Sequence, residues 1–133
     1  MMKKSYPFFM FTNCKAENAI NLYLSIFKDA KLETLERWPQ GNPAAPAGTV
    51  QNALLTLKNV TYRFMDSQGH DHSLTPSTSI FVVCDDEAEL RKAYEEFMKS
   101  GGQELVPLGE YPFSRLFVWL QDEYGLTWQL SLE

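Results

Sequence analysis

The sequence lacks the features that mark several large classes of protein. Its two cysteines, Cys14 and Cys84, are too few for a disulfide framework and indicate reduced thiols. No apolar run approaches the length that crosses a membrane. The apolar segment Pro7–Phe11 follows two lysines, but it is too short for a signal-peptide core, and no small-residue cleavage site follows it. The sequence therefore predicts a cytoplasmic protein without a membrane partner.

Basic residues are also scarce. Lysine and arginine number 12 against 17 acidic residues, which gives a net charge of −5, and no basic patch extends beyond Lys3-Lys4. Nucleic acids and anionic membranes bind clustered lysine and arginine, so neither is expected as the main partner. No glycine-rich nucleotide loop follows the first expected strand.

What the sequence does contain is an ordinary globular composition, 44% hydrophobic and 14% aromatic, at a length that fits one domain. Helical spacing of apolar residues predicts a helix over residues 15–27 with Asn13 as its cap. A second helix begins at Asp86, which forms a capping box with Glu89, and it ends before Gly101-Gly102. Short alternating or β-branched runs predict eight strands, at residues 6–12, 31–38, 49–57, 60–66, 77–84, 103–108, 113–120 and 126–132.

These elements follow the order βαβββ twice, which predicts an α+β fold made of two repeated modules. The modules cover residues 1–67 and 76–133 of a single domain, and a polar connector at residues 68–75 joins them. A short sequence match supports the repeat, since residues 9–17 align with residues 81–89 and both end in Ala-Glu.

The segment Asp122–Leu132 is a turn followed by a clearly alternating strand. Trp128, Leu130 and Leu132 point to one side, which predicts a face covered by a helix. Thr127, Gln129 and Ser131 point to the other side. That polar face is either solvated or lines a small pocket, and the residues alone leave both readings open.

Three local patterns carry a family resemblance: Pro7–Phe11 with Ala16-Glu17 and Tyr23–Phe27, Val60–Asp66, and Phe113–Leu130. With the duplicated module, they resemble the vicinal-oxygen-chelate superfamily of glyoxalase I, extradiol dioxygenases and bleomycin-resistance proteins, and within it the PhnB-like branch. This resemblance implies a pair of cup-shaped half-barrels. Members of the branch are often labelled after a ubiquinone methyltransferase, a label that we do not expect to describe the chemistry of this chain.

The resemblance also implies where a divalent metal ion would bind. The superfamily's ligand positions fall on Phe8, Met65, Ser79 and Gln129, and a shift of one at Met65 would bring in Phe64 or Asp66. Phenylalanine has no ligand atom, the thioether of methionine is soft, and a neutral serine is a weak ligand. We therefore predict no cofactor and no tightly held metal ion.

Two histidines, His70 and His72, lie in the polar connector with Asp66 and Asp71 nearby. Their spacing permits a metal site, which makes Asp66, His70, His72 and Gln129 the alternative ligand set. Solvated loop histidines are the preferred reading, because serine and glycine flank them.

The resemblance and the missing metal ligands together favour a PhnB-like protein of unassigned reaction. We expect it to bind a small organic molecule in the cup and to form a homodimer. The alternatives are a metal-dependent lyase, isomerase or dioxygenase with a rearranged metal site, and a structural dimer module. One strand face carries Arg115, Phe117 and Trp119, and it could bind a ligand or pack at a subunit interface. Trp38, just before the proline-rich loop, could close over the cup as part of a lid or lie exposed. The predicted pocket residues are Phe8, Met10, Trp38, Met65, Ser79, Arg115, Phe117, Trp119, Thr127 and Gln129.

Overall fold

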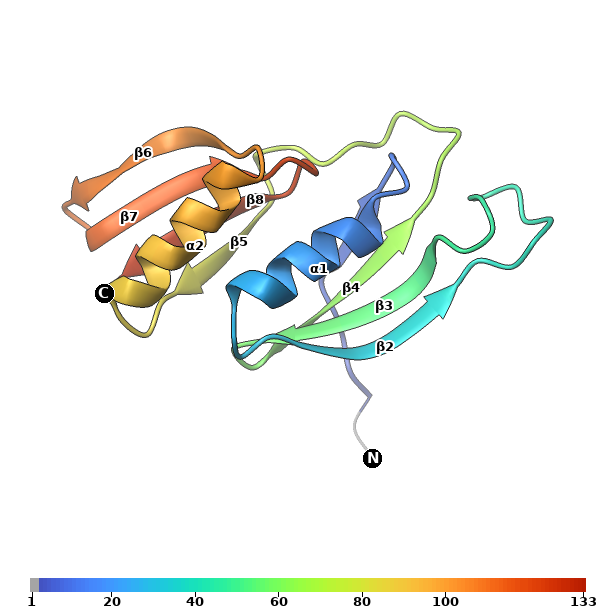
Figure 1. The fold of residues 1–133 in the computed structure, drawn as a ribbon, viewed down its shortest axis with the longest axis horizontal. Coiled ribbons are helices and arrows are strands. Elements are labelled where there is room, and N and C mark those ends of the chain that lie inside the picture. The colour runs from blue at the N-terminus through green and yellow to red at the C-terminus, as the bar shows by residue number, and fades with distance from the viewer. Residues whose placement is uncertain (1–2) are drawn as a thin grey trace. The chain divides into compact units, whose positions relative to one another are not determined.

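The computed structural model describes residues 3–133 and contains two βαβββ modules, which confirms the predicted α+β class (Figure 1). The chain divides into two compact units, Met1–Ser73 and Leu74–Glu133, each with one four-stranded sheet and one helix. Neither helix within residues 3–133 is long and apolar enough to span a membrane. The elements are β1 (Phe8–Phe11), α1 (Ala16–Ile26), β2 (Lys31–Arg37), β3 (Val50–Leu57), β4 (Val60–Asp66), β5 (Ser79–Val83), α2 (Glu87–Lys99), β6 (Gln103–Tyr111), β7 (Ser114–Gln121) and β8 (Thr127–Leu132).

The first module has the strand order β1-β4-β3-β2, in which β1 runs parallel to β4 and the other pairs are antiparallel. Helix α1 lies across one face of this sheet (Figure 1). Alternation along the strands directs Phe9, Phe11 and Phe64 to the helix side, where they are buried with Tyr23 of the helix. The rings of Tyr23 and Phe64 lie 6.2 Å apart, so aromatic packing forms much of this core.

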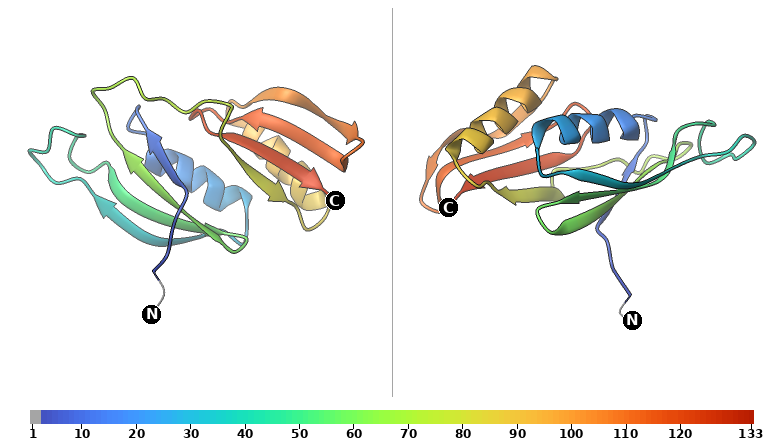
Figure 2. Two further views of the ribbon diagram at one scale, coloured as in Figure 1. Left: turned by 180° about the vertical axis from the view of Figure 1, so that it is seen from behind. Right: turned by 60° about the horizontal axis from the view of Figure 1, so that its bottom comes forward.

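The second module repeats this plan with the order β5-β8-β7-β6 and a parallel β5–β8 pair. Seen from behind, its strands lie in front of α2, so the helix covers only one face of the sheet (Figure 2). Trp128 is fully buried on that face, and its ring lies 5.2 Å from the ring of Phe97 on α2. The predicted core position of Trp128 is therefore confirmed.

The two helices begin in different ways. Asp86 accepts the backbone N–H of Glu89 at 2.8 Å, as the capping box predicts, although the Glu89 carboxylate returns to the N–H of Asp85. The predicted cap of α1 is wrong, because Asn13 accepts the N–H of Lys15 outside the helix. The first helical N–H, that of Ala16, instead donates at 3.0 Å to Asp66, which lies 50 residues away.

Hydrogen bonds hold the proline-rich loop at residues 39–48 where it leaves and rejoins the sheet. The backbones of Trp38 and Thr49 pair at 2.7 Å, and the indole Nε1–H of Trp38 donates to the carbonyl oxygen of Asp66 at 2.8 Å. Arg37 holds the Glu17 carboxylate with two hydrogen bonds and also donates to the Gly48 carbonyl. These contacts anchor Trp38 to its own sheet and give Glu17 a structural role.

Candidate functional site

The face of the second sheet that α2 leaves uncovered holds the candidate site. Ser79 and Phe81 on β5, Gln129 on β8 and Trp119 on β7 share this face and lie side by side in the register. The side-chain amide Nε2 of Gln129 donates to Ser79 Oγ at 2.8 Å, so the two predicted polar residues are brought together. Phe81 lies directly opposite Gln129 and is 50% exposed, which places an open aromatic surface beside the polar pair.

The polar residues on either side of Gln129 are not solvated. Thr127 and Ser131 are fully buried. The Thr127 hydroxyl donates to the Thr78 carbonyl at 2.8 Å, and Ser131 Oγ bonds to Ser114 Oγ at 2.8 Å. The interpretation of this strand face as a solvated surface is therefore wrong. Of the three residues, Gln129 is the one whose side chain is partly exposed.

Arg115, Phe117 and Trp119 share the uncovered face of β7 as predicted, but only two of them lie near Gln129. Trp119 pairs with Gln129 across the strands, and Phe117 is buried with its ring 6.3 Å from that of Phe81. Arg115 is exposed, and its Nε and Nη2 donate to the backbone oxygen of Glu133 at 2.9 and 2.6 Å. The guanidinium therefore links β7 to the C-terminal residue Glu133 at the end of the sheet.

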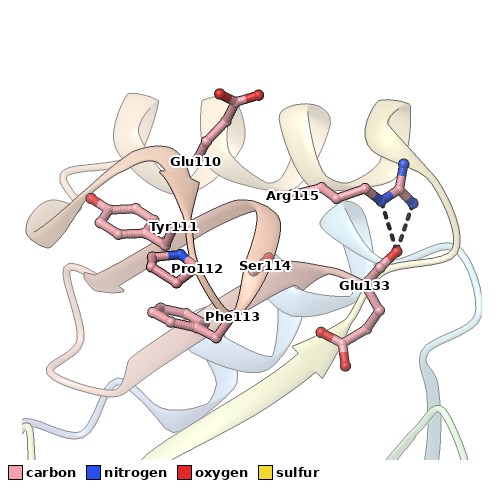
Figure 3. Close-up of a pocket in the computed structure, with 7 residues that line it drawn as sticks. All are labelled: Glu110, Tyr111, Pro112, Phe113, Ser114, Arg115 and Glu133. Atoms are coloured by element: carbon pink, nitrogen blue, oxygen red, sulfur yellow. Dashed lines mark hydrogen bonds between the residues drawn. The ribbon is translucent and has the colours of Figure 1, made fainter.

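Arg115 also lines a surface pocket of about 390 Å³ at the β6–β7 hairpin (Figure 3). The rings of Tyr111 and Phe113 stack there at 5.6 Å, and Phe113 is 61% exposed. Sequence reasoning missed Tyr111 and Phe113 as surface features, although an aromatic-proline-aromatic turn is an available signal. The remaining residues that line the pocket are Glu110, Pro112, Ser114 and Glu133.

The first module presents an equivalent but less polar face. Phe8 pairs with Arg63 and Ser79 pairs with Thr127, so Met65 and Gln129 each lie two residues beyond the partner of the first-strand residue. This shared register supports Met65, and not Phe64 or Asp66, as the counterpart of Gln129. Phe64 and Asp66 are buried on the helix side, whereas Met65 and Met10 are partly exposed on the other face with Phe8.

The residues at the superfamily's ligand positions do not fit a divalent metal ion. In the first module the two positions hold a phenyl ring and a thioether, neither of which suits a hard cation. In the second module, the two positions hold a hydroxyl and an amide, and Gln129 Nε2 donates to Ser79 Oγ. Neither pair supplies the carboxylate, imidazole or thiolate ligands that catalytic ions require.

The alternative ligand set is engaged in structural hydrogen bonds. Asp66 is buried, and its two carboxylate oxygens accept the N–H groups of Ala16 and Val50 at 3.0 and 2.9 Å. Burial raises the pKa of the Asp66 carboxyl, against the lowering effect of those two hydrogen bonds. In the connector, the Nδ1 atom of His70 accepts the backbone N–H of His72, and the two rings lie 5.1 Å apart.

The family model of 3-demethylubiquinone-9 3-methyltransferase matches residues 3–131 of the chain. The chain belongs to this family. Its label is the methyltransferase name that the resemblance anticipated, and the PhnB-like assignment is confirmed. No curated protein matches the chain.

Solved structures show the fold that this member of the 3-demethylubiquinone-9 3-methyltransferase family shares with a PhnB protein and with glyoxalase-type proteins. The PhnB protein from Bacillus cereus is 36% identical, with a TM-score of 0.87 over 98% of this chain and 100% of that one. A glyoxylase/bleomycin resistance protein/dioxygenase domain from Frankia is 17% identical, with a TM-score of 0.65 over 99% and 98%. Fosfomycin resistance protein FosX from Mesorhizobium loti is 14% identical, with a TM-score of 0.64 over 100% and 93%. The last two likenesses show the shared fold alone.

Proposed function

We propose that this PhnB-like protein binds a small organic molecule on the uncovered face of its second module, without a tightly held metal ion. The observation that supports this proposal is the Ser79–Gln129 pair beside Phe81 and Trp119, where a polar group with hydrogen-bonding capacity adjoins open aromatic surface. Small-molecule sites combine apolar walls with a few placed polar groups. None of these four side chains carries a charge, so apolar contact and neutral hydrogen bonds would supply the affinity.

The test is a ligand screen on protein dialysed against a chelator. A library of planar aromatic compounds is expected to contain members that raise the melting temperature, because a ligand that binds only the folded state stabilises it. Gln129→Leu is expected to weaken binding of such members about tenfold, the effect of losing one hydrogen bond of roughly 1.4 kcal/mol. Gln51→Leu makes the same change at an exposed position of β3 and should leave binding unaltered.

Metal analysis of the freshly purified protein completes this test. A stoichiometric divalent ion that resists dialysis, and whose removal abolishes ligand binding, would contradict the metal-free proposal. Equal binding by wild type and Gln129→Leu would contradict the placement of the ligand.

The protein is also proposed to form a homodimer through its sheets. Phe113, Phe81 and Val83 of the second module are 61%, 50% and 46% exposed, and apolar surface of this extent favours a partner. The thiols of Cys14 and Cys84, neither of them in a disulfide, support a reducing, cytoplasmic setting.

Phe113→Ser is expected to raise the dimer dissociation constant about tenfold, because it removes a large apolar side chain from the proposed interface. Light scattering over a dilution series measures this constant. Leu105→Ser, at a 39% exposed position of the same module, is the matched control. A monomer at every concentration, or equal effects of the two variants, would refute the proposed interface.

A further inference from the structure

The three tryptophans of the chain differ in what their indole N–H groups bond to. Trp38 donates to the Asp66 carbonyl at 2.8 Å, and Trp128 donates to a carboxylate oxygen of Asp122 at 3.0 Å. The Nε1 atom of Trp119 is buried, yet no hydrogen-bond partner for it is found among residues 3–133. A buried donor without a partner loses the hydrogen bonds that it would make to water, so such donors are rare in folded proteins.

The position of this donor relates it to the candidate site. Trp119 lies opposite Gln129 on the uncovered face of the second sheet, and side chains opposite each other in an antiparallel pair are in contact range. The amide Nε2 of Gln129 is already directed to Ser79 on the far side of β8. No hydrogen bond joins Gln129 to the Trp119 N–H, although the two residues lie opposite each other in the strand pair.

We propose that Trp119 Nε1–H, which protein atoms cover in this structure, is uncovered when a molecule binds and donates a hydrogen bond to an oxygen acceptor of that molecule, so that the site selects uncharged aromatic compounds that carry a carbonyl or similar group. This inference rests on the proposed binding function and specifies its ligand class. An indole N–H can only donate, so it requires an acceptor. The exposed ring of Phe81 provides flat apolar surface, and no charged side chain among these residues would balance an anionic ligand.

Three probes with one two-ring body separate the possibilities: naphthyl methyl ketone, ethylnaphthalene and naphthoate. The ketone and the ethyl compound have nearly the same shape, and only the ketone accepts a hydrogen bond. We expect the wild-type protein to bind the ketone about tenfold more tightly than ethylnaphthalene, and naphthoate more weakly than the ketone. Isothermal titration measures the three dissociation constants.

Trp119→Phe keeps an aromatic ring and removes the donor. It is expected to bring the ketone-to-ethyl ratio to about one while ethylnaphthalene binding persists, because only the hydrogen bond is lost. Trp38→Phe is the matched control and should retain the tenfold ratio, since its N–H is bonded to its own sheet. Folding offers a second readout, because Trp119→Phe removes an unsatisfied donor and is expected to leave the melting temperature unchanged or higher.

A nitrogen–hydrogen correlation spectrum observes the donor directly. The indole resonance of Trp119 should move downfield with the ketone and much less with ethylnaphthalene, while those of Trp38 and Trp128 stay in place. If the ketone and the ethyl compound bind wild type equally, the inference is overturned and the binding function stands. If none of the three probes binds, the inference is overturned together with the proposed site.

Discussion

Replacing Asp122 with alanine is expected to destabilise the protein by about 4 kcal/mol, because it removes the acceptor of three donors, two of them in buried hydrogen bonds. Asp122 is buried, and its Oδ1 atom accepts the backbone N–H groups of Tyr124 and Leu126 at 2.9 and 3.1 Å. Its Oδ2 atom accepts the indole N–H of Trp128 at 3.0 Å. Each hydrogen bond to a charged acceptor contributes about 1.5–3 kcal/mol, and partial relaxation of the turn reduces the sum.

Urea unfolding measures this loss as a lower midpoint at constant slope. Glu123→Ala removes the same charge from the exposed neighbouring position and is expected to change stability by less than about 0.5 kcal/mol. A double-mutant cycle with Trp128→Phe isolates the third bond: Asp122→Asn should cost less when the indole N–H is absent. Equal effects of Asp122→Ala and Glu123→Ala would show that the turn does not depend on this carboxylate.

The sequence predicts the fold well because the decisive signals are local. Alternation along residues 126–132 correctly divides the strand into a helix-facing side with Trp128 and an opposite side with Gln129. The cap of α2 is also local, since Asp86 and Glu89 lie within one turn of each other. The repeated βαβββ order then specifies the class of fold without any information about distant contacts.

The site is less predictable because it depends on contacts between distant residues. Thr127 is a polar residue of the kind that is typical of a solvated strand face. It is nevertheless buried, because β8 lies between its neighbours β5 and β7. The meeting of Ser79 with Gln129 spans 50 residues and was expected only from the family resemblance. No sequence pattern distinguishes Trp119, with its unpartnered N–H, from Trp128, because the difference lies in what each indole meets after folding.

Asp66 is the clearest case of a long-range contact replacing a local one. The sequence offers Asn13 as the helix cap, since it lies just before the first turn and has a suitable side chain. The fold brings the end of β4 to the same place, and Asp66 caps α1 at Ala16 while it also binds Val50 at the start of β3. One carboxylate therefore joins three elements of the first module.

Asp66→Ala is accordingly expected to destabilise the protein by about 3 kcal/mol at neutral pH, since it removes a helix cap and leaves two backbone N–H groups unpartnered. Asp71→Ala is the matched control, because Asp71 is exposed in the connector of the same module. Urea unfolding of both variants measures the difference. A loss no larger than that of Asp71→Ala would mean that water or Asn13 replaces the missing cap.

The pH dependence of this loss tests the electrostatics of the site. Burial raises the folded-state pKa of Asp66 above its ordinary value of 3.8, so the unfolded chain releases this proton at lower pH than the folded protein does. The associated stabilisation is fully present below the unfolded pKa and is lost as the pH rises through the folded pKa. The stability difference between wild type and Asp66→Ala should therefore be larger at pH values below the ordinary pKa and become smaller toward neutrality. A difference that grows with pH would show that the hydrogen bonds from Ala16 and Val50 outweigh burial, and that the folded protein holds Asp66 preferentially as the anion.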